Sequence, residues 1–243
     1  MNVVDSGVVM ELLICLLVLS LITLLAPVYG YPSKNSPLGD DTFIIQNTSS
    51  FIDETNLMHV YGEVKNILNL SVSNVTVSGS FYDGNGQLLN KYKRSCELPT
   101  VTAGVVCPFE IVYIDTTTTN NVKDFKLSAQ GIVANISKPT ELKLYSENSR
   151  LDILGFYYIN GRILNEGSVT ATDSSVVATL YDNDGRVIAI GRALAEPVSI
   201  PTGSLANFGI AVAERLQVHK TEGYSLTAFS NQYVSSPLSI TSK

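Results

Sequence analysis

The sequence is poor in the side chains that enzymes use. Its 243 residues include only two histidines, His59 and His219, and contain no Gly-rich phosphate loop, Gly-x-Ser-x-Gly elbow or His-Glu-x-x-His motif. The sequence therefore predicts no catalytic site, no metal centre and no cofactor. Both histidines are interpreted as solvated surface residues, one on the outward face of a strand and one in a loop. These features favour a binding or structural role.

Basic residues are also scarce. The chain has 16 Lys and Arg against 22 Asp and Glu, a net charge of −6, and no basic cluster stands out along the sequence. Binding to nucleic acid requires concentrated positive charge, because the protein must neutralise phosphates. The composition therefore argues against nucleic acid as a partner.

Charge is absent altogether from residues 12–33. Twenty-two uncharged residues are long enough to cross a bilayer, which favours an uncleaved membrane anchor. The alternative is a signal peptide whose apolar stretch ends at Ala26 and which is cleaved after Gly30. A signal peptide normally begins with basic residues, whereas this one offers Asp5 and Glu11. We expect the rest of the chain to lie outside the cytoplasm, tethered to the membrane or secreted.

The remainder of the chain is one module written twice. Residues 41–137 align with residues 140–236 at a constant offset of 99, without a gap. Matching pairs include Val77 with Val176, Phe109 with Phe208, Leu127 with Leu226 and Ala129 with Ala228. A repeat of this length can close its own hydrophobic core, so the sequence predicts two tandem domains.

Each copy has the period of two that is typical of β-strands. Met58, Val60 and Val64 alternate with polar residues in the first copy, so His59, Tyr61, Glu63 and Lys65 are expected on the solvent side. No convincing amphipathic helix follows residue 33. Several short strands in about 97 residues are typical of an antiparallel β-sandwich of the immunoglobulin or fibronectin type, so we predict an all-β fold with two such sandwiches.

Short polar turns separate the strands. The sequences Asp-Gly-Asn-Gly at 83–86 and Asp-Asn-Asp-Gly at 182–185 predict hairpins, because Asp and Asn favour tight turns and the closing Gly86 or Gly185 supplies a positive φ. The same turns offer oxygen ligands for calcium, and the weak candidates are Asp83, Asn85, Asp182 and Asp184. Turn stabilisation explains these residues without a metal and is the preferred interpretation.

Two further pairs recur beside these strands. Tyr82 and Tyr181 are predicted to be half-buried rings whose hydroxyl groups find backbone partners. Asn66 and Asn165 are predicted to cap the turn that follows each of them.

The residues of the first copy that recur as a motif are Gly62, Val64, Asn66, Phe81, Tyr82, Asp83, Gly86, Gly104 and Phe109, with partners 99 positions later that include Gly161, Asn165, Tyr181, Asp182 and Gly185. This motif resembles the FxLYD domain, an immunoglobulin-like module of bacterial and archaeal envelope proteins. Gly62 and Gly161 are predicted to allow a bulge or a close backbone approach. The leading Phe of the family motif is replaced by Gly79 and Ala178, so its contact must be missing or supplied elsewhere. The resemblance implies a binding or structural part and no common catalysis.

Cys96 and Cys107 lie in the first copy, and both are replaced by alanine in the second, at Ala195 and Ala206. Two thiols that are lost together indicate a disulfide, which would place the chain in an oxidising compartment. The alternative is two independent buried thiols. A metal site is disfavoured because no histidine or third cysteine lies nearby in the sequence.

Four N-x-Ser/Thr sequons occur in the first copy, at Asn47, Asn69, Asn74 and Asn135. None has an acceptor asparagine in the second copy, so the fold does not require them. They are candidate glycosylation sites at the level of the motif alone.

Together these features predict an anchor or signal peptide at 1–33, linkers at 34–40 and 138–140, and sandwiches at 41–137 and 141–240. We expect a membrane-anchored, extracytoplasmic binding protein whose partner is another envelope or surface protein. Loops 115–121 and 214–220 are the expected contact regions. The rival class is an enzyme or metal-dependent accessory factor whose site is assembled between the two domains.

Overall fold

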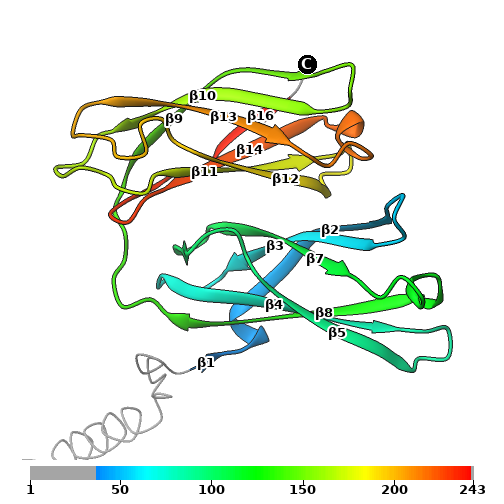
Figure 1. The fold of residues 1–243 in the computed structure, drawn as a ribbon. Coiled ribbons are helices and arrows are strands. Elements are labelled where there is room, and N and C mark those ends of the chain that lie inside the picture. Colours follow the sequence, from blue (N-terminus) through cyan, green and yellow to red (C-terminus); the bar gives the residue numbers. More distant parts are fainter. Residues whose placement is uncertain (1–36, 242–243) are drawn as a thin grey trace, which may run out of the picture. The chain divides into compact units, whose positions relative to one another are not determined.

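The computed structural model describes residues 37–241, which are built almost entirely from β-strands (Figure 1). The helical segments in this range are three short 3-10 turns, η1 (Asp40–Thr42), η2 (Thr119–Asn121) and η3 (Val218–Lys220). Within it, no helix has the length and apolar character needed to cross a membrane. The predicted anchor or signal peptide, residues 1–33, lies outside the described residues.

The first copy forms a sandwich of two antiparallel sheets. One sheet has the strand order β1-β8-β4-β5, with β6 paired to β4, and the other has the order β2-β3-β7. The strands are β1 (Pro37–Leu38), β2 (Phe43–Ile52), β3 (Met58–Asn66), β4 (Val72–Tyr82), β5 (Leu88–Ser95), β6 (Thr100–Val101), β7 (Val106–Tyr113) and β8 (Asp124–Val133). Strand β1 pairs with β8, so part of the expected linker belongs to this sandwich.

The second copy closes a core with one continuous sheet in the order β12-β11-β14-β15-β9-β10-β13, and β16 pairs with β14. Its strands are β9 (Thr140–Leu151), β10 (Tyr157–Asn165), β11 (Ser175–Tyr181), β12 (Val187–Leu194), β13 (Leu205–Val212), β14 (Gly223–Phe229), β15 (Val234–Ser235) and β16 (Leu238–Thr241). All pairs are antiparallel except β15 with β9. The predicted all-β fold with packed sandwiches is confirmed.

The repeat is visible in the element bounds. Strands β3, β5 and β7 and the turn η2 each begin and end 99 residues before β10, β12, β13 and η3. Positive φ values recur at Gly86 and Gly185, where the hairpin turns were predicted, and at Gly104 and Gly203. The two copies therefore fold with the same register.

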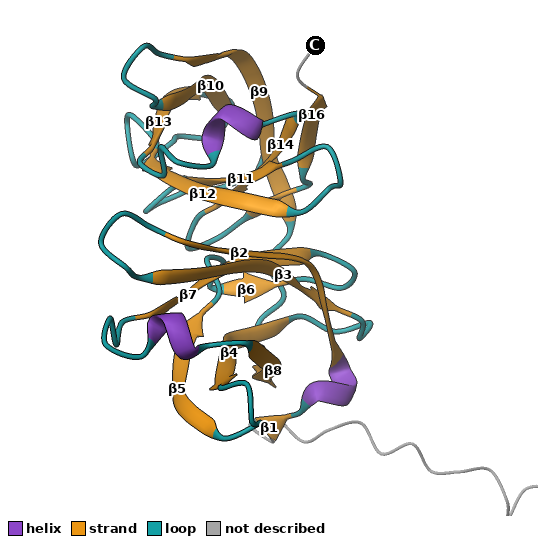
Figure 2. Cartoon of the chain, turned by 90° about the vertical axis from the view of Figure 1, so that its right-hand side faces the viewer, coloured by secondary structure: helices purple, strands orange, loops and turns teal. Residues whose placement is uncertain are grey.

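The outward face of β3 differs from the prediction. Val60 and Val64 are buried in the first core as expected, but Tyr61 and Glu63 are buried as well. The cause is tertiary, because β12 of the second copy packs against β2, β3 and β7 (Figure 2). Val177 and Phe229 of the second copy join the apolar cluster of the first. This contact between the copies, which we call the junction, covers a face that the local pattern assigns to solvent.

Candidate functional site

A cluster of titratable side chains lies on the outward face of the β2-β3-β7 sheet. His59 Nδ1 lies 2.7 Å from Glu110 Oε1, and His59 Nε2 lies 3.3 Å from Asp53 Oδ2. The hydroxyl of Tyr61 donates to the same Glu110 oxygen at 2.8 Å. Strand pairing explains the arrangement, because Tyr61 is directly opposite Glu110 and His59 is opposite Phe51.

The interpretation of His59 as a solvated residue is wrong. Its side chain is only 14% exposed, because its ring stacks on Phe51 at a centroid distance of 4.9 Å and lies beside Tyr61. Its partner Glu110 is 51 positions away, so no local signal could reveal the pair. His219, by contrast, is exposed on η3, in agreement with the prediction.

The cluster shifts the pKa of each member. Hydrogen bonding to Glu110 raises the pKa of His59, although burial opposes this, and Asp53 adds to the increase. Burial tends to raise the pKa of Glu110, but hydrogen bonds from His59 and Tyr61 outweigh it and lower that pKa. Burial raises the pKa of Tyr61, and the charge of Glu110 raises it further. Both ring nitrogens of His59 are therefore engaged by carboxylates of the cluster.

A second polar group lies within the junction. The carboxylate of Glu63 is 2% exposed, its Oε1 accepts a 2.5 Å hydrogen bond from the Tyr181 hydroxyl, and its Oε2 accepts one of 2.8 Å from Asn47 Nδ2. The predicted backbone partner of Tyr181 is therefore wrong. Burial raises the pKa of Tyr181, and the charge of Glu63 contributes to the increase.

The repeat supplies an internal comparison for this group. At the position equivalent to Glu63 the second copy has Arg162, which is exposed and pairs with Glu147 at 2.5 Å. The position equivalent to Tyr181 is Tyr82, whose half-buried ring lies beneath Lys126 Nζ at 5.5 Å. Glu63 of the first copy and Tyr181 of the second thus meet at the junction, whereas their equivalents, Arg162 and Tyr82, do not.

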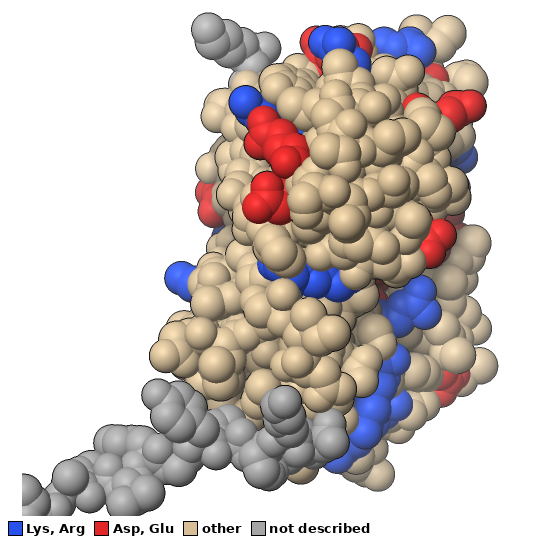
Figure 3. All heavy atoms as spheres, turned by 90° about the vertical axis from the view of Figure 1, so that its left-hand side faces the viewer, with Lys and Arg blue, Asp and Glu red and all other residues tan. Residues whose placement is uncertain are grey.

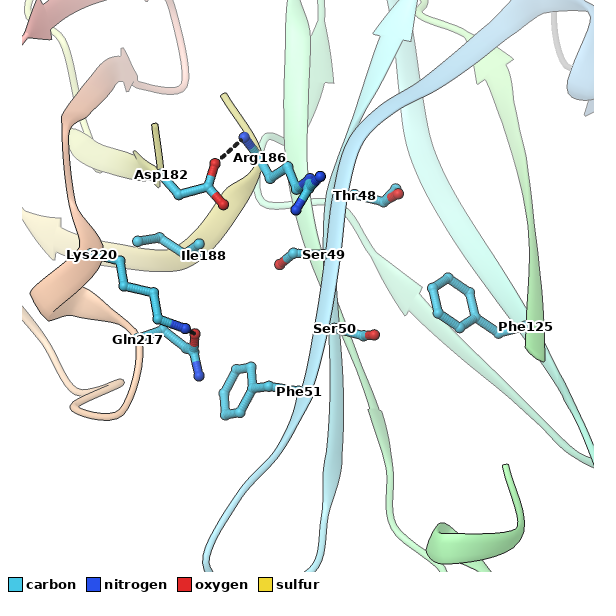
Figure 4. A pocket seen from close by; sticks show the side chains of 10 residues that line it. All are labelled: Thr48, Ser49, Ser50, Phe51, Phe125, Asp182, Arg186, Ile188, Gln217 and Lys220. Carbon is cyan, nitrogen blue, oxygen red and sulfur yellow. Dashed lines mark hydrogen bonds between the residues drawn. The ribbon is translucent and has the colours of Figure 1, made fainter. Parts of the chain in front are cut away.

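A hollow of about 380 Å³ borders the junction (Figure 4). It is lined by residues 48–51 of β2 and, from the second copy, by polar side chains that include Asp182, Arg186 and Lys220. Asp182 Oδ1 already accepts the backbone N–H of Arg186 at 2.8 Å, and Lys220 Nζ donates to Gln217 Oε1 at 2.8 Å. Two of the polar groups that line the hollow are therefore already hydrogen-bonded to their neighbours.

The Asp residues of the hairpin turns act as turn acceptors. Asp83 Oδ1 accepts the backbone N–H groups of Asn85 and Gln87, and Asp182 Oδ1 accepts those of Asp184 and Arg186. Among residues 37–241, no group of three or more His, Cys, Asp or Glu side chains is arranged to hold a metal ion. The preferred interpretation of these turns accounts for the calcium candidates.

The structure joins Cys96 and Cys107 in a disulfide with a Cα–Cα distance of 5.8 Å. The sulfur of Cys107 also accepts the backbone N–H of Leu98 at 3.1 Å. The equivalent Ala195 and Ala206 are buried, so the second copy packs the same site without a crosslink.

The four sequon asparagines all have exposed positions on the first sandwich. Asn69, Asn74 and Asn135 lie near strand ends, and Asn74 has a φ of 52°. Asn47 differs because its Nδ2, the atom that would carry a glycan, donates to the buried Glu63. A glycan on Asn47 would therefore compete with a hydrogen bond of the junction.

Asn66 and Asn165 do more than cap a turn. Each is fully buried, and its Oδ1 accepts the N–H two residues later, from Leu68 and Gly167 respectively. The Nδ2 of Asn66 donates to the carbonyls of Leu70 and Val101, and that of Asn165 donates to the equivalent carbonyls of Val169 and Ile200. Each amide therefore fixes the loop after its strand to a second segment of the same copy.

The structure also accounts for the repeated glycines. A Cβ on Gly161 would overlap the backbone oxygen of Tyr145, and the strand register shifts between Asn160 and Gly161, in agreement with the predicted bulge or close backbone approach. A Cβ on Gly62 would instead meet a side chain, 2.7 Å from Phe109 Cζ. At Gly79, the Phe81 and Ile111 side chains fill the space that a larger residue would occupy. Neighbouring core residues therefore fill the space beside position 79.

The two expected contact loops differ. Loop 115–121 is closed by its own hydrogen bonds, since the Asp115 carboxylate accepts from the hydroxyls of Thr117 and Thr118. Loop 214–220 contributes Leu216 to a hollow of about 410 Å³, which Leu154 from the tip of the β9–β10 hairpin also lines. Loop 214–220 also has internal hydrogen bonds, such as that from Leu216 N to Glu214 Oε1, so the two loops differ in that the second borders this hollow.

That hairpin tip is unusually apolar. Ile153 is 102% exposed and Leu154 is 64% exposed. The equivalent residues of the first copy are Glu54 and Thr55, so the turn itself does not require apolar side chains.

Strand pairing forms a small basic cluster that does not stand out along the sequence. Strand pairing brings Lys91, Lys93 and Lys126 onto one face of the β1-β8-β4-β5 sheet, because Ser80 of β4 is opposite both Lys91 and Lys126. The first two residues lie on β5 and the third on β8, so their spacing along the sequence hides the cluster.

No protein-family profile matches the sequence, and no curated protein matches it significantly. Solved structures to which the chain is similar include the exo-chitosanase CsxA of Amycolatopsis orientalis (11% identity, TM-score 0.29, covering 81% of this chain and 26% of that one). They also include red sea bream transglutaminase (10%, 0.27, 82% and 31%) and a calcium-binding mutant of Bacteroides uniformis β-glucuronidase 2 (11%, 0.28, 82% and 28%). The chain spans about a quarter to a third of the length of these proteins. At these TM-scores the likenesses carry no argument about its function.

Proposed function

We propose that the chain is a non-catalytic, extracytoplasmic binding protein, held at the membrane by residues 12–33 and presenting two immunoglobulin-like sandwiches of the FxLYD type to an envelope or surface protein. The proposal rests on one observation: the titratable groups that the fold brings together are hydrogen-bonded to one another. His59, Asp53 and Glu110 satisfy one another, and Glu63 is satisfied by Tyr181 and Asn47.

The extracytoplasmic placement has independent support. Residues 12–33 contain no charge, and the Cys96–Cys107 disulfide would be stable in an oxidising compartment. The sequon asparagines Asn69, Asn74 and Asn135 are exposed, so each can accept a glycan without disturbing the core.

The tip of the β9–β10 hairpin supplies the contact surface that we favour. Ile153 and Leu154 expose apolar side chains on a turn whose counterpart in the first copy is polar, at Glu54 and Thr55. Interfaces bury apolar anchors at their centre, surrounded by polar groups. Here Glu214 and Arg215 of the adjoining loop line the same hollow as Leu154 and would form part of such a rim.

Two measurements on native membranes test the placement. Mass spectrometry of the mature N-terminus is expected to find residues 12–33 retained, whereas a start near Tyr31 would indicate the secreted alternative. A membrane-impermeant amine reagent is expected to modify the exposed Lys143 in intact cells. Modification only after the cells are broken would overturn an extracytoplasmic location.

A further inference from the structure

One face of the first sandwich gathers three lysines. On the sheet β1-β8-β4-β5, Ser80 lies between Lys91 and Lys126, and Ser78 lies between Lys93 and Ser128. Residues that oppose one another in a sheet project from the same side. We call this surface the basic face; its members are Lys91, Lys93, Lys126, Ser78, Ser80 and Ser128.

The lysines of the basic face are available to a partner. All three are exposed, and none takes part in an ion pair with a described residue. Two acidic groups border the face: Asp124, whose Oδ1 accepts the N–H of Phe125, and Asp40, which lines a hollow with Ser78 and Ser128 and accepts the N–H of Ala129. Figure 3 shows Lys and Arg side chains gathered along one side of the first sandwich. The face therefore holds more basic than acidic side chains, although the whole chain has a net charge of −6.

The second copy shows that this face of the module is suited to docking. The positions equivalent to Lys91 and Ser78 are Ile190 and Val177, and both pack into the apolar cluster of the first sandwich at the junction. Part of this surface is therefore apolar and covered in the second copy, at Val177 and Ile190, while the other equivalent positions are polar: Thr179, Arg192, Ser225 and Thr227. In the first copy the lysines of this surface are exposed. A lysine-rich surface fits a partner that is negatively charged and well hydrated.

The place where the chain enters the first sandwich indicates which negatively charged partner is within reach. Strand β1, which begins at Pro37, is the first strand of the same sheet. Only residues 34–36 separate it from the uncharged segment, and the span from Ser33 to Pro37 is at most about 14 Å. Lys126 is six residues along β8 from Ile132, the partner of Pro37, a distance of about 20 Å. If residues 12–33 span the bilayer, this short connection allows the basic face to reach the membrane surface.

We propose that the basic face binds the anionic lipid headgroups of the membrane that holds the anchor, with the lysines facing the lipid phosphates and the serine hydroxyls donating hydrogen bonds to them. Basic side chains near a membrane surface are attracted by its negative potential within about one Debye length. This contact would fix the orientation of the sandwiches relative to the membrane. The inference rests on the proposed anchor.

The test uses the full chain in nanodiscs of phosphatidylcholine, with and without phosphatidylglycerol. Each lysine is acetylated briefly, and its rate of modification is measured by mass spectrometry. We expect anionic discs to slow modification of Lys91, Lys93 and Lys126 by about threefold or more at low salt, and high salt to remove the protection. Lys143 and Lys220 of the second copy are exposed controls and should react at the same rate in both discs.

The outcomes distinguish a failure of docking by the basic face from a failure of the membrane anchor. Equal rates for the three lysines in neutral and anionic discs, with the chain retained in both, would overturn the docking of the basic face. Failure of the chain to remain in either disc would overturn the anchor, and with it the basis of the inference. A Lys91→Gln, Lys93→Gln, Lys126→Gln chain provides a second check, because Lys123, exposed just before β8, should then lose any protection that docking confers on it.

Discussion

The hydroxyl of Tyr181 donates a hydrogen bond to Oε1 of Glu63, a residue 118 positions earlier in the sequence. The bond joins the two copies of the repeat at the buried junction, where Ser49 Oγ also donates to the carbonyl of Val187. Neither residue has the same role in the other copy, where the equivalents are Tyr82 and Arg162. The junction is therefore a feature of the pair of modules and is absent from the repeated pattern.

Replacing Tyr181 by Phe tests this bond. The change leaves one oxygen of the buried Glu63 without its donor, and we expect the free energy of unfolding to fall by about 1–3 kcal/mol. The matched control is Tyr82→Phe in the first copy, whose ring is half-buried at the surface and whose replacement should change stability by less than about 0.5 kcal/mol. Chemical denaturation followed by circular dichroism measures both. Equal losses for the two variants would show that the junction bond contributes nothing specific.

The His59 cluster predicts a dependence of stability on pH. The pKa of His59 is raised above the ordinary 6.5, so its stabilising contribution is complete below that value and is lost as pH rises through the folded pKa. The pKa values of Glu110 and Asp53 are lowered below the ordinary 4.5 and 3.8, so their contributions are present above those values and are lost as pH falls through the folded pKa. The cluster should stabilise the fold most at mildly acidic pH, from about 5 to 6.5.

Urea denaturation at a series of pH values on both sides of 6.5 measures this dependence. The decrease in midpoint above pH 6.5 should shrink in His59→Gln and persist in His219→Gln, which removes the exposed histidine. A decrease of the same size in His59→Gln would mean that another group titrates.

The disulfide of the first copy is expected to contribute to stability in an amount set by its short loop. Cys96 and Cys107 are 11 positions apart, and on the chain-entropy model their crosslink contributes about 2–3 kcal/mol. The double change to alanine reproduces the residues of the second copy, Ala195 and Ala206, and should fold with that loss. Non-reducing mass mapping of the native chain should find one peptide pair. Alkylation of both thiols in the native protein would contradict the bridge.

Asn66 and Asn165 provide a prediction that must hold twice. Each buried amide makes three hydrogen bonds to backbone groups, and replacement by alanine leaves those groups unpaired. We expect each variant to lose about 2–4 kcal/mol, with similar values because the geometry is shared. A thermal melt of each variant measures the loss. A large effect in one copy and none in the other would contradict equivalent roles.

Much of the fold could be predicted from the sequence because its signals are local. The strand alternation around Val60 and Val64, the hairpin turns ending at Gly86 and Gly185, and the paired loss of Cys96 and Cys107 all lie within short segments. The constant offset of 99 then requires the two copies to share one register. The structure reproduces that register in its strand bounds.

The site could not be predicted to the same extent, because it depends on contacts between distant segments. His59 is polar and alternates with apolar neighbours, which indicates a solvent-facing residue until Glu110 is placed opposite its strand and Phe51 beside it. The burial of Glu63 depends on which face of the second sandwich meets the first, and the sequence pattern does not encode that choice. Strand order likewise brings Lys126 near Lys91, although 35 positions separate them.

The binding function is tested most directly by photocrosslinking in intact cells, with a photoreactive amino acid placed at Ile153 of the full chain. Thr202, exposed in the loop before β13 at the opposite end of the same sandwich, is the matched control. We expect Ile153 to give one discrete adduct with an envelope protein that is absent from the Thr202 variant. No adduct from either position, or the same adducts from both, would contradict a specific binding role for this surface.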